Sequence, residues 1–216
     1  MLALPRVVVA VMLALASPAL ALPRVAVVTG ATRGIGRGIA LELGRCGYRV
    51  YCLGRSKRGQ QTSERPVAED LDLTVESAAE AVTAAGGMGV GIACDLSTPD
   101  TIDAALARIS DEESRIDLLV CSAFTTPPGR LRGDFWEQGT AMWDACNGVG
   151  LRGTYATCVA AVPSLIGTAA KHADSAPLVV LVSSFGGQAY TFNVAYGVGK
   201  AAVDRLASDM AVQLTG

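Results

Sequence analysis

Tyr196 and Lys200 are the residues whose types and spacing best suit chemistry. They lie four positions apart and therefore share one face of a helix. A phenol has an ordinary pKa of about 10 and exchanges protons poorly at neutral pH, but a neighbouring ammonium stabilises its anion. Ser184 ends an apolar run upstream, and its hydroxyl could hydrogen-bond a carbonyl oxygen on which charge develops. We predict Ser184, Tyr196 and Lys200 as the catalytic residues, with Ser183 as the weaker alternative to Ser184.

A glycine-rich turn near the N-terminus predicts a site for a phosphate-bearing ligand. The apolar, β-branched run over residues 25–28 is typical of a buried parallel strand. Gly30, Gly34 and Gly36 follow this run, and a helix is expected from about Ile35. Glycines let backbone N–H groups approach a ligand, and a helix N-terminus attracts negative charge. The turn therefore predicts a pyrophosphate site, although such glycines also serve plain strand-to-helix packing.

The end of the second expected strand indicates which dinucleotide binds. Residues 49–53 are expected to form this strand, and Arg55 follows it closely. In dinucleotide-binding folds an acidic residue here binds the ribose hydroxyls of NAD, whereas an arginine suits the 2′-phosphate of NADP. The acid is absent, Arg33 in the glycine turn adds a second cation, and Lys57 and Arg58 lie just beyond. Each could be a solvated charge, but together they favour NADP(H) as the cofactor.

The rest of the pattern predicts the elements that must position these residues. Strands are expected at 90–94, 118–121 and 178–184, and helical stretches such as 73–85 lie between them. This alternation predicts an α/β fold, with a Rossmann-like doubly wound parallel sheet and helices on both faces. The polar stretch 56–72 is expected to be a surface loop.

Composition excludes several classes of protein. A chain of 216 residues, 50% of them hydrophobic, can bury one sizeable core, so residues 23–216 are expected to form one domain. The net charge of -2 gives no reason to expect a nucleic acid partner. His172 is the sole histidine and is expected in a solvated loop, so neither a Ser-His-Asp hydrolase nor a multi-histidine metal site is expected. The six cysteines have no Cys-x-x-Cys spacing and suit small core positions better than disulfides or zinc ligands.

Residues 1–22 form a hydrophobic N-terminal segment that has two interpretations. Arg6 precedes an apolar run that leads to an Ala-x-Ala sequence ending at Ala21. This pattern matches a secretory signal peptide, and membrane association through these residues is one expectation. The sequence Leu2-Ala-Leu-Pro-Arg-Val recurs from Leu20, immediately before the first strand. A gene-model artefact, and with it a cytoplasmic protein, is therefore the other expectation.

Taken together, the motifs resemble those of the short-chain dehydrogenase/reductase (SDR) family. The resemblance rests on Thr29-Gly-x-x-x-Gly-Ile-Gly in its strand-turn-helix context and on Ser184 upstream of Tyr196-x-x-x-Lys200, and it extends over about residues 25–216. It implies hydride transfer between NADP(H) and a small carbonyl or alcohol substrate, in a protein associated with the endoplasmic reticulum. It also implies that Tyr196 exchanges the proton, that Lys200 binds the nicotinamide ribose and lowers the tyrosine pKa, and that Ser184 orients the substrate.

The resemblance also implies further contacts and shows where this sequence departs from the family. Asp95 matches an aspartate that contacts the adenine in the family, but capping of the loop before the next helix is equally open. Where the family usually has Asn-Asn-Ala-Gly, this chain has Cys121-Ser-Ala-Phe and retains only Ala123, which weakens the hydrogen bonding expected around the central strand. Gly150 stands where many members carry an asparagine that holds a water of the proton relay, and Asn147 is a possible substitute.

These inferences define a predicted site and leave one alternative open. The predicted cofactor-binding residues are Gly30, Arg33, Gly34, Ile35, Gly36, Arg55, Asp95, Ala123, Tyr196 and Lys200. The alternative is a non-catalytic NADP(H)-binding or interaction protein. It is favoured because no last strand or substrate-covering loop follows the helix of Lys200, as expected of a sequence truncated at its C-terminal end. By family resemblance we also expect a homo-oligomer, formed through helices around residues 143–165 and 196–214.

Overall fold

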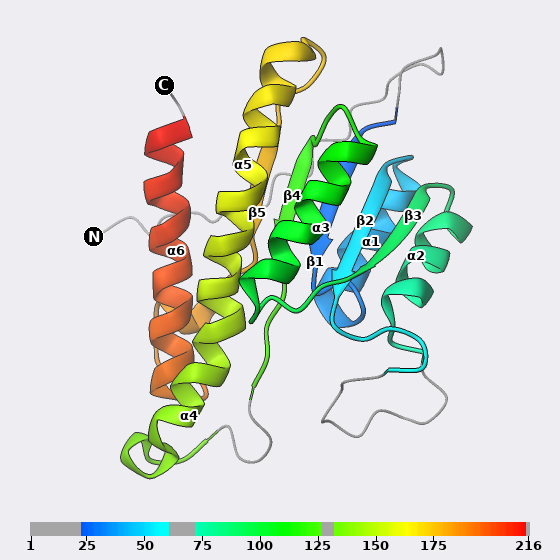
Figure 1. Cartoon of the computed structure of the whole chain (residues 1–216). Helices are drawn as coiled ribbons and strands as arrows, with labels where there is room; N and C mark the ends of the chain where they lie inside the picture. The colour runs from blue at the N-terminus through cyan, green and yellow to red at the C-terminus, as the bar shows by residue number, and fades with distance from the viewer. Residues whose placement is uncertain (1–22, 61–71, 127–131, 215–216) are drawn as a thin grey trace.

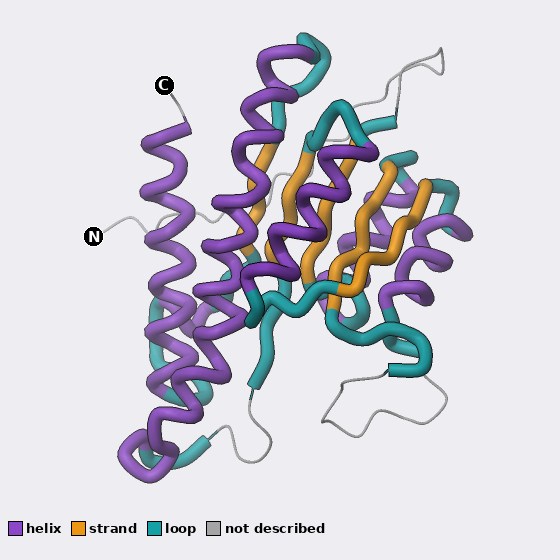
Figure 2. Tube along the Cα trace, in the orientation of Figure 1, coloured by secondary structure: helices purple, strands orange, loops and turns teal. Residues whose placement is uncertain are grey.

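The alternating apolar strands and helices fold into one parallel sheet that is covered on both faces (Figures 1 and 2). The computed structural model describes residues 23–60, 72–126 and 132–214, so the N-terminal segment 1–22 lies outside it. Within these residues the strands are β1 (Val25–Thr29), β2 (Arg49–Gly54), β3 (Met88–Ala93), β4 (Leu118–Cys121) and β5 (Leu178–Leu181). The α-helices are α1 (Gly34–Arg45), α2 (Val75–Ala84), α3 (Pro99–Glu112), α4 (Phe135–Asn147), α5 (Thr154–Lys171) and α6 (Val194–Leu214). The predicted fold class is confirmed.

Strand β1 explains why an unbroken apolar run is needed at the centre of the sheet. Successive side chains of a strand point to opposite faces. Val25 and Val27 pack with α3 and α5 on one face, whereas Ala26 and Val28 pack with α1 and α2 on the other. All four side chains are at most 1% exposed. Because helices cover both faces, neither set of alternating positions tolerates a polar residue.

The strand order creates the position at which a ligand can bind. The order is β3-β2-β1-β4-β5, and all neighbouring strands are parallel. The chain therefore winds outward from β1 in one direction through β2 and β3, and in the other through β4 and β5. At such a reversal the loops that leave the two central strands diverge, and a crevice opens at their carboxyl ends. The glycine turn after β1 and the loop after β4 both lie at this reversal.

Helix α6 packs against α4, beside the half of the sheet formed by β4 and β5. Between α4 and α5 the helix widens into a π-helical segment, η1 (Gly148–Gly153), a feature that often marks functional sites. The amide of Asn147 donates hydrogen bonds to the carbonyl oxygens of Trp143 and Ala195, so it links the end of α4 to α6. Met142 and Cys146 bury Ala195 in the same contact. This packing holds the first turn of α6 against α4.

The observed strands differ from the predicted ones at β5, which ends at Leu181 and not at residue 184, and at β3. This strand begins at Met88, earlier than the predicted start at residue 90. Its glycines are poor strand formers, but they are needed because α2 packs directly on the strand. A Cβ at Gly89 would lie 2.0 Å from the carbonyl oxygen of Ala79, and one at Gly91 would lie 2.7 Å from that of Val75. Close packing of a helix therefore outweighs local propensity here.

The cysteines and the histidine take up largely the predicted environments. All six cysteine thiols are free, and five of them are buried, whereas Cys46 is exposed at the end of α1. His172 follows the last residue of α5 and is partly exposed. In the described ranges no group of three or more His, Cys, Asp and Glu side chains has an arrangement that could hold a metal ion.

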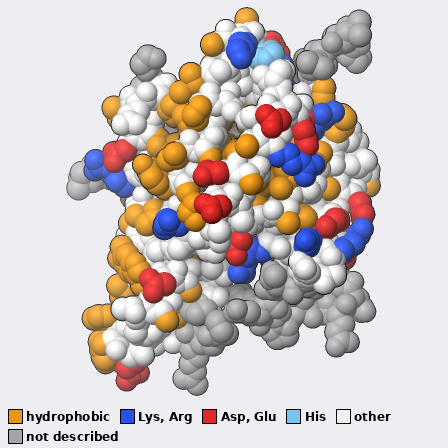
Figure 3. Space-filling model, in the orientation of Figure 1, with side chains coloured by type: hydrophobic (Ala, Val, Ile, Leu, Met, Phe, Trp, Pro, Cys, Tyr) orange, Lys and Arg blue, Asp and Glu red, His pale blue; other side chains and the backbone are white. Residues whose placement is uncertain are grey.

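Apolar side chains are exposed on the outer faces of the C-terminal helices (Figure 3). On α5, Tyr155, Val159 and Ile166 are each more than half exposed, and on α6 Val212 is 76% exposed. The segment Phe135–Lys171 is long and apolar enough to span a membrane by length and composition, but it packs on the sheet as a core helix does.

Candidate functional site

A cleft of about 760 Å³ opens at the carboxyl ends of β1 and β4. Of the predicted site residues it brings together Gly30, Arg33, Ile35, Gly36, Arg55, Asp95, Ala123, Ser184, Tyr196 and Lys200. Gly34 is the one predicted residue that does not line the cleft, and it forms the first residue of α1. Residues far apart in sequence thus converge where the sheet topology predicts a ligand.

The glycine turn is shaped by contacts that exclude side chains. Gly30 has a φ of +68°, and a Cβ there would lie 2.7 Å from Cα of Ala123. A Cβ at Gly36 would lie 2.4 Å from the carbonyl oxygen of Gly30. Both contacts are too short for any other residue, so the turn and the start of α1 pack directly against the loop after β4. The bare backbone that results forms a cradle at the N-terminus of α1.

Thr29 ties the loop after β4 to β1. Its hydroxyl accepts hydrogen bonds of 3.2 Å and 3.3 Å from the backbone N–H groups of Ser122 and Ala123. The donors are backbone groups, so these bonds do not depend on the side chains of the segment 121–124, where the sequence departs from the family pattern. The side chain of Cys121 is buried in the core. Hydrogen bonding to Cys158 together with burial raises the pKa of its thiol.

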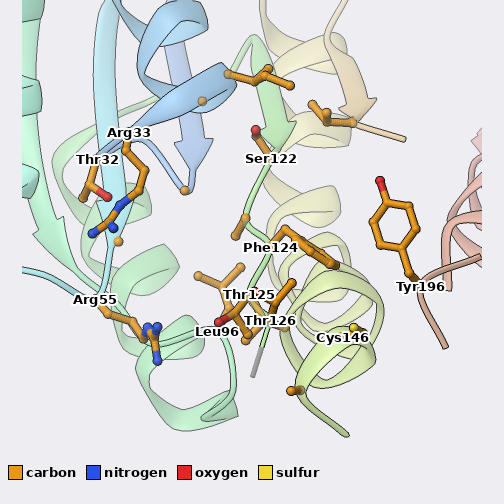
Figure 4. Close-up of a pocket in the computed structure, with 18 of the residues that line it drawn as sticks. Thr32, Arg33, Arg55, Leu96, Ser122, Phe124, Thr125, Thr126, Cys146 and Tyr196 are labelled. Atoms are coloured by element: carbon orange, nitrogen blue, oxygen red, sulfur yellow. The ribbon is translucent and has the colours of Figure 1, made fainter. Parts of the chain in front are cut away.

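Two arginines lie at one end of the cleft and Tyr196 at the other (Figure 4). Arg33 comes from the turn before α1, and the exposed side chain of Arg55 follows β2. Arg58 is engaged elsewhere, because its guanidinium bonds both carboxylate oxygens of Glu80 at 2.6 Å and reaches Asp72 at 2.8 Å. Of the basic residues around this strand end, Arg33 and Arg55 are therefore the ones that line the cleft.

Asp95 both lines the cleft and organises its own turn. Its Oδ1 accepts hydrogen bonds from the backbone N–H of Ser97 at 2.9 Å and from the Ser97 hydroxyl at 2.7 Å. This turn leads into α3, so the loop-capping interpretation has direct contacts. An adenine contact for the same carboxylate stays a prediction.

Tyr196 and Ser184 meet across the cleft wall. The phenol of Tyr196 donates a hydrogen bond of 2.8 Å to the hydroxyl of Ser184. The same Ser184 oxygen accepts the backbone N–H of Gly186 at 3.1 Å, which orients the serine. Ser183 instead directs its hydroxyl to the carbonyl oxygen of Lys200, at 3.4 Å. The geometry therefore favours Ser184 over Ser183 as the partner of Tyr196.

Lys200 is buried one helical turn beyond Tyr196. Its side chain donates a hydrogen bond of 2.9 Å from Nζ to the carbonyl oxygen of Val182, and Nζ lies 6.0 Å from the centre of the Tyr196 ring. The residue is only 8% exposed. Burial lowers the pKa of the ammonium, and the carboxylate of Asp204 partly opposes this effect. The ammonium is therefore a buried charge beside the Tyr196 ring.

Asn193, Phe124 and Phe192 contact Tyr196 and were not predicted from the sequence as site residues. Asn193, which is 1% exposed, accepts the backbone N–H of Tyr196 at 2.8 Å and so caps the start of α6. An asparagine three residues before the tyrosine was an available signal for this cap. Phe124 and Phe192 contact Tyr196 edge-on, with ring centres 5.4 Å and 5.3 Å from that of the tyrosine. No local pattern announces these two contacts, because they join separate loops.

The proposed relay substitute is engaged in packing. The amide nitrogen of Asn147 donates hydrogen bonds to the backbone carbonyl oxygens of Trp143 and Ala195. Gly150 is buried in η1. A relay role for Asn147 stays a prediction.

This combination of fold and site defines a class of protein. The sequence profile described as short chain dehydrogenase matches residues 24–216, and the chain belongs to the short-chain dehydrogenase/reductase family of oxidoreductases. It is similar to dehydrogenase/reductase SDR family member 1, with 40% identity to the Mus musculus protein and 38% to the Homo sapiens protein, each over 195 residues. The alignment covers 88% of this chain and 56% of each relative, so the chain spans little more than half their length.

Solved structures support the same assignment. A metagenomic short-chain oxidoreductase in complex with NADP is 32% identical, with a TM-score of 0.71 over 89% of this chain and 76% of that one. A 3-oxoacyl-[acyl-carrier protein] reductase from Brucella melitensis in complex with NAD is 25% identical, with a TM-score of 0.72 over 90% and 69% of the two chains. The two neighbours thus hold different nicotinamide dinucleotides.

Proposed function

We propose that this chain is an NADP(H)-dependent oxidoreductase that reduces carbonyl compounds or oxidises the corresponding alcohols. The observation that carries the proposal is the hydrogen bond of 2.8 Å between Tyr196 and Ser184, with the buried Lys200 ammonium close by. This group of side chains lies in the same cleft as the glycine turn and Arg55. A proton-exchanging group and an anion-binding cradle therefore share one cavity.

The residues of the cleft fit a nicotinamide dinucleotide. The cradle of Gly30 and Gly36 has no room for a Cβ, and it presents the N-terminus of α1 to the cleft, where a pyrophosphate would be held. Arg33 and Arg55 would hold the 2′-phosphate of NADP(H), and no carboxylate stands at position 55 to select NAD. When bound, NADP(H) supplies or accepts the hydride, while the chain itself supplies position and charge.

The chain's own residues account for the proton. In carbonyl reduction the O–H bond of Tyr196 breaks, and its proton goes to the substrate oxygen, which becomes the alcohol oxygen. The Ser184 hydroxyl would bind the same substrate oxygen and stabilise the charge that develops on it. The ammonium of Lys200 stabilises the phenolate left on Tyr196. In alcohol oxidation the proton moves in the opposite direction.

The experiment that tests this proposal is a titration of the purified full chain with NADPH and with NADH, followed by cofactor fluorescence and thermal shift. We expect NADPH to bind at least about tenfold more tightly, because charge-assisted hydrogen bonds to a phosphate contribute about 1.5–3 kcal/mol. A panel of aldehydes, ketones and quinones then follows. Absence of binding to either cofactor would contradict the proposal, and binding of NADPH without turnover of any substrate would favour the non-catalytic alternative.

We also propose a homo-oligomer formed through the exposed apolar faces of α5 and α6. Tyr155, Val159 and Val212 are exposed there, and burying such a face stabilises association. Light scattering of the eluting protein tests this, since a monomer at micromolar concentration would contradict it. Membrane association through residues 1–22 rests on the sequence, and flotation of the full chain with phospholipid vesicles tests it.

A further inference from the structure

Phe124 packs between Gly150 of η1 and the pair of Tyr196 and Lys200. It follows Ala123 in the loop after β4, lines the cleft and is 38% exposed. Its ring contacts the Tyr196 ring edge-on. The Nζ atom of Lys200 lies over the same ring, 5.2 Å from its centre. This distance is within the range of about 6 Å in which an aromatic face attracts a cation.

The space that the Phe124 ring fills is left by Gly150. A Cβ at position 150 would lie 2.9 Å from Cδ2 and 3.3 Å from Cε2 of Phe124. Any larger side chain there would collide with the ring or push it away from Lys200. Phe124 and Gly150 are therefore matched in size across the boundary between the β4 loop and η1.

On the side away from the main cleft, the space beside Lys200 is small. Phe124, Gly150, Tyr196 and Lys200 line a small cavity of about 10 Å³, which has room for about one water molecule. Cys146 of α4 also lines this cavity, and burial raises the pKa of its thiol, so it stays neutral. The other titratable groups around the ammonium, Tyr196 and Asp204, come from α6 itself.

We propose that Phe124 is a positioning residue whose ring face holds the Lys200 ammonium beside Tyr196. The ring lies in the space that a side chain at position 150 would need. The aromatic face and the carbonyl oxygen of Val182 then hold the ammonium from two directions. The contribution of this arrangement to catalysis rests on the proposed function. The contact between the Phe124 ring and the Lys200 ammonium does not rest on the proposed function, and its effect on the lysine can be measured without turnover.

The test compares the wild-type chain with Phe124→Leu and Phe124→Tyr. Leucine keeps the apolar bulk that excludes water but has no aromatic face, whereas tyrosine keeps the face. Competitive acetylation with acetic anhydride across a pH series, read by mass spectrometry, reports when each lysine becomes deprotonated. The exposed Lys171 serves as the internal reference. We expect Lys200 of Phe124→Leu to become reactive at a pH about half a unit lower than in the wild type, and that of Phe124→Tyr to be unchanged.

A second variant guards against misfolding of Phe124→Leu. Gly150→Ala leaves the sequence of the loop intact but forces the ring away from its place, so Lys200 should shift in the same direction. The double variant should shift no further than Phe124→Leu alone, because both changes remove the same contact. An unchanged Lys200 titration in both single variants, or a shift to higher pH, would overturn the proposal.

Activity then separates the two hypotheses. If the chain reduces carbonyls, the alkaline limb of its rate against pH should move to lower pH in Phe124→Leu and stay in place in Phe124→Tyr, because the ammonium is lost earlier. A shifted lysine titration in a chain that turns over no substrate would refute the proposed function and leave the role of Phe124 standing. Turnover in a chain whose lysine titration is unshifted would support the proposed function and refute the role of Phe124.

Discussion

The phenol of Tyr196 donates a hydrogen bond of 2.8 Å to the hydroxyl of Ser184, and this bond joins the first turn of α6 to the segment after β5. The bond requires the turn between them to be bare, because a Cβ at Gly186 would lie 2.5 Å from Cε1 of Tyr196. Asn193 holds the tyrosine from the other side by capping its backbone N–H. Two hydroxyls are thus held within hydrogen-bonding distance before any substrate arrives.

Removal of the Tyr196 hydroxyl should abolish turnover. In Tyr196→Phe the ring and its contacts with Phe124 and Phe192 are kept, but the proton donor is lost, so we expect kcat to fall by about 10²–10⁴. NADPH affinity, measured by fluorescence, should change less than about twofold. Tyr190→Phe is the matched control, since Tyr190 is 73% exposed and does not line the cleft. Retained turnover in Tyr196→Phe would exclude tyrosine as the acid.

The two adjacent serines should behave differently. Ser184→Ala removes the acceptor for Tyr196 and the hydroxyl that, under the proposed function, binds the substrate oxygen, so we expect kcat to fall by about 10–10³. Ser183→Ala removes only a bond of 3.4 Å to the backbone of Lys200 and should change kcat less than about threefold. Steady-state kinetics of both variants decide the assignment. An equal loss in the two variants would count against a specific role for Ser184.

Cofactor choice should depend on Arg55 and not on Arg58. Arg55→Ala should weaken NADPH binding by about 10–100-fold and leave NADH binding unchanged, because only NADPH carries the 2′-phosphate. Arg58→Ala should alter neither affinity, since its guanidinium is held by Glu80 and Asp72 outside the cleft. Fluorescence titrations of the four protein–cofactor pairs give the answer. Equal losses for NADPH and NADH in Arg55→Ala would contradict phosphate recognition.

A buried ion pair at the amino ends of β1 and β4, opposite the cleft, should control acid stability. Arg115 and Asp117 form two hydrogen bonds, of 2.8 Å and 2.6 Å, and Asp117 also accepts the backbone N–H of Val25 at 2.8 Å. Both side chains are 5% exposed. Asp117→Asn leaves the buried Arg115 charge with only the exposed carboxylate of Asp174, 3.3 Å away, and should lower the free energy of unfolding by about 3 kcal/mol at pH 7. Urea unfolding measures this, with exposed Asp111→Asn as the control.

The pH dependence of this loss has a definite sign. Burial by itself would raise the pKa of Asp117, but hydrogen bonds from Arg115, Ser175 and Val25 outweigh it and hold the pKa below its ordinary value of 3.8. A carboxyl whose folded pKa is depressed stabilises the fold above its unfolded pKa, and that stability is lost as the pH falls through the folded pKa. The difference between wild type and Asp117→Asn should therefore shrink below about pH 4. A difference that stays constant down to pH 3 would contradict this account.

The central strand and the glycine turn were predictable because their signals are local. A run of four apolar residues before three spaced glycines specifies a buried strand, a turn and a helix start within one short stretch. The pairing of Tyr196 with Lys200 is local as well, because one helical turn separates them. The predicted start of β3 was wrong by two residues, since the packing of α2 on Gly89 and Gly91 is a tertiary contact.

By itself, the sequence determined the fold class, the family and the residues capable of proton exchange, because periodicity, glycine spacing and side-chain chemistry act over a few neighbouring positions. The sequence favoured Ser184 over Ser183, but only the tertiary structure showed the bond from Tyr196 to Ser184, the engagement of Arg58 by Glu80, and the position of Phe124 over Lys200. Each of these depends on which of two neighbouring side chains points into the cleft, or on contacts between loops far apart in sequence. Such contacts are set by the packing of the whole sheet and its helices, and no local pattern encodes them.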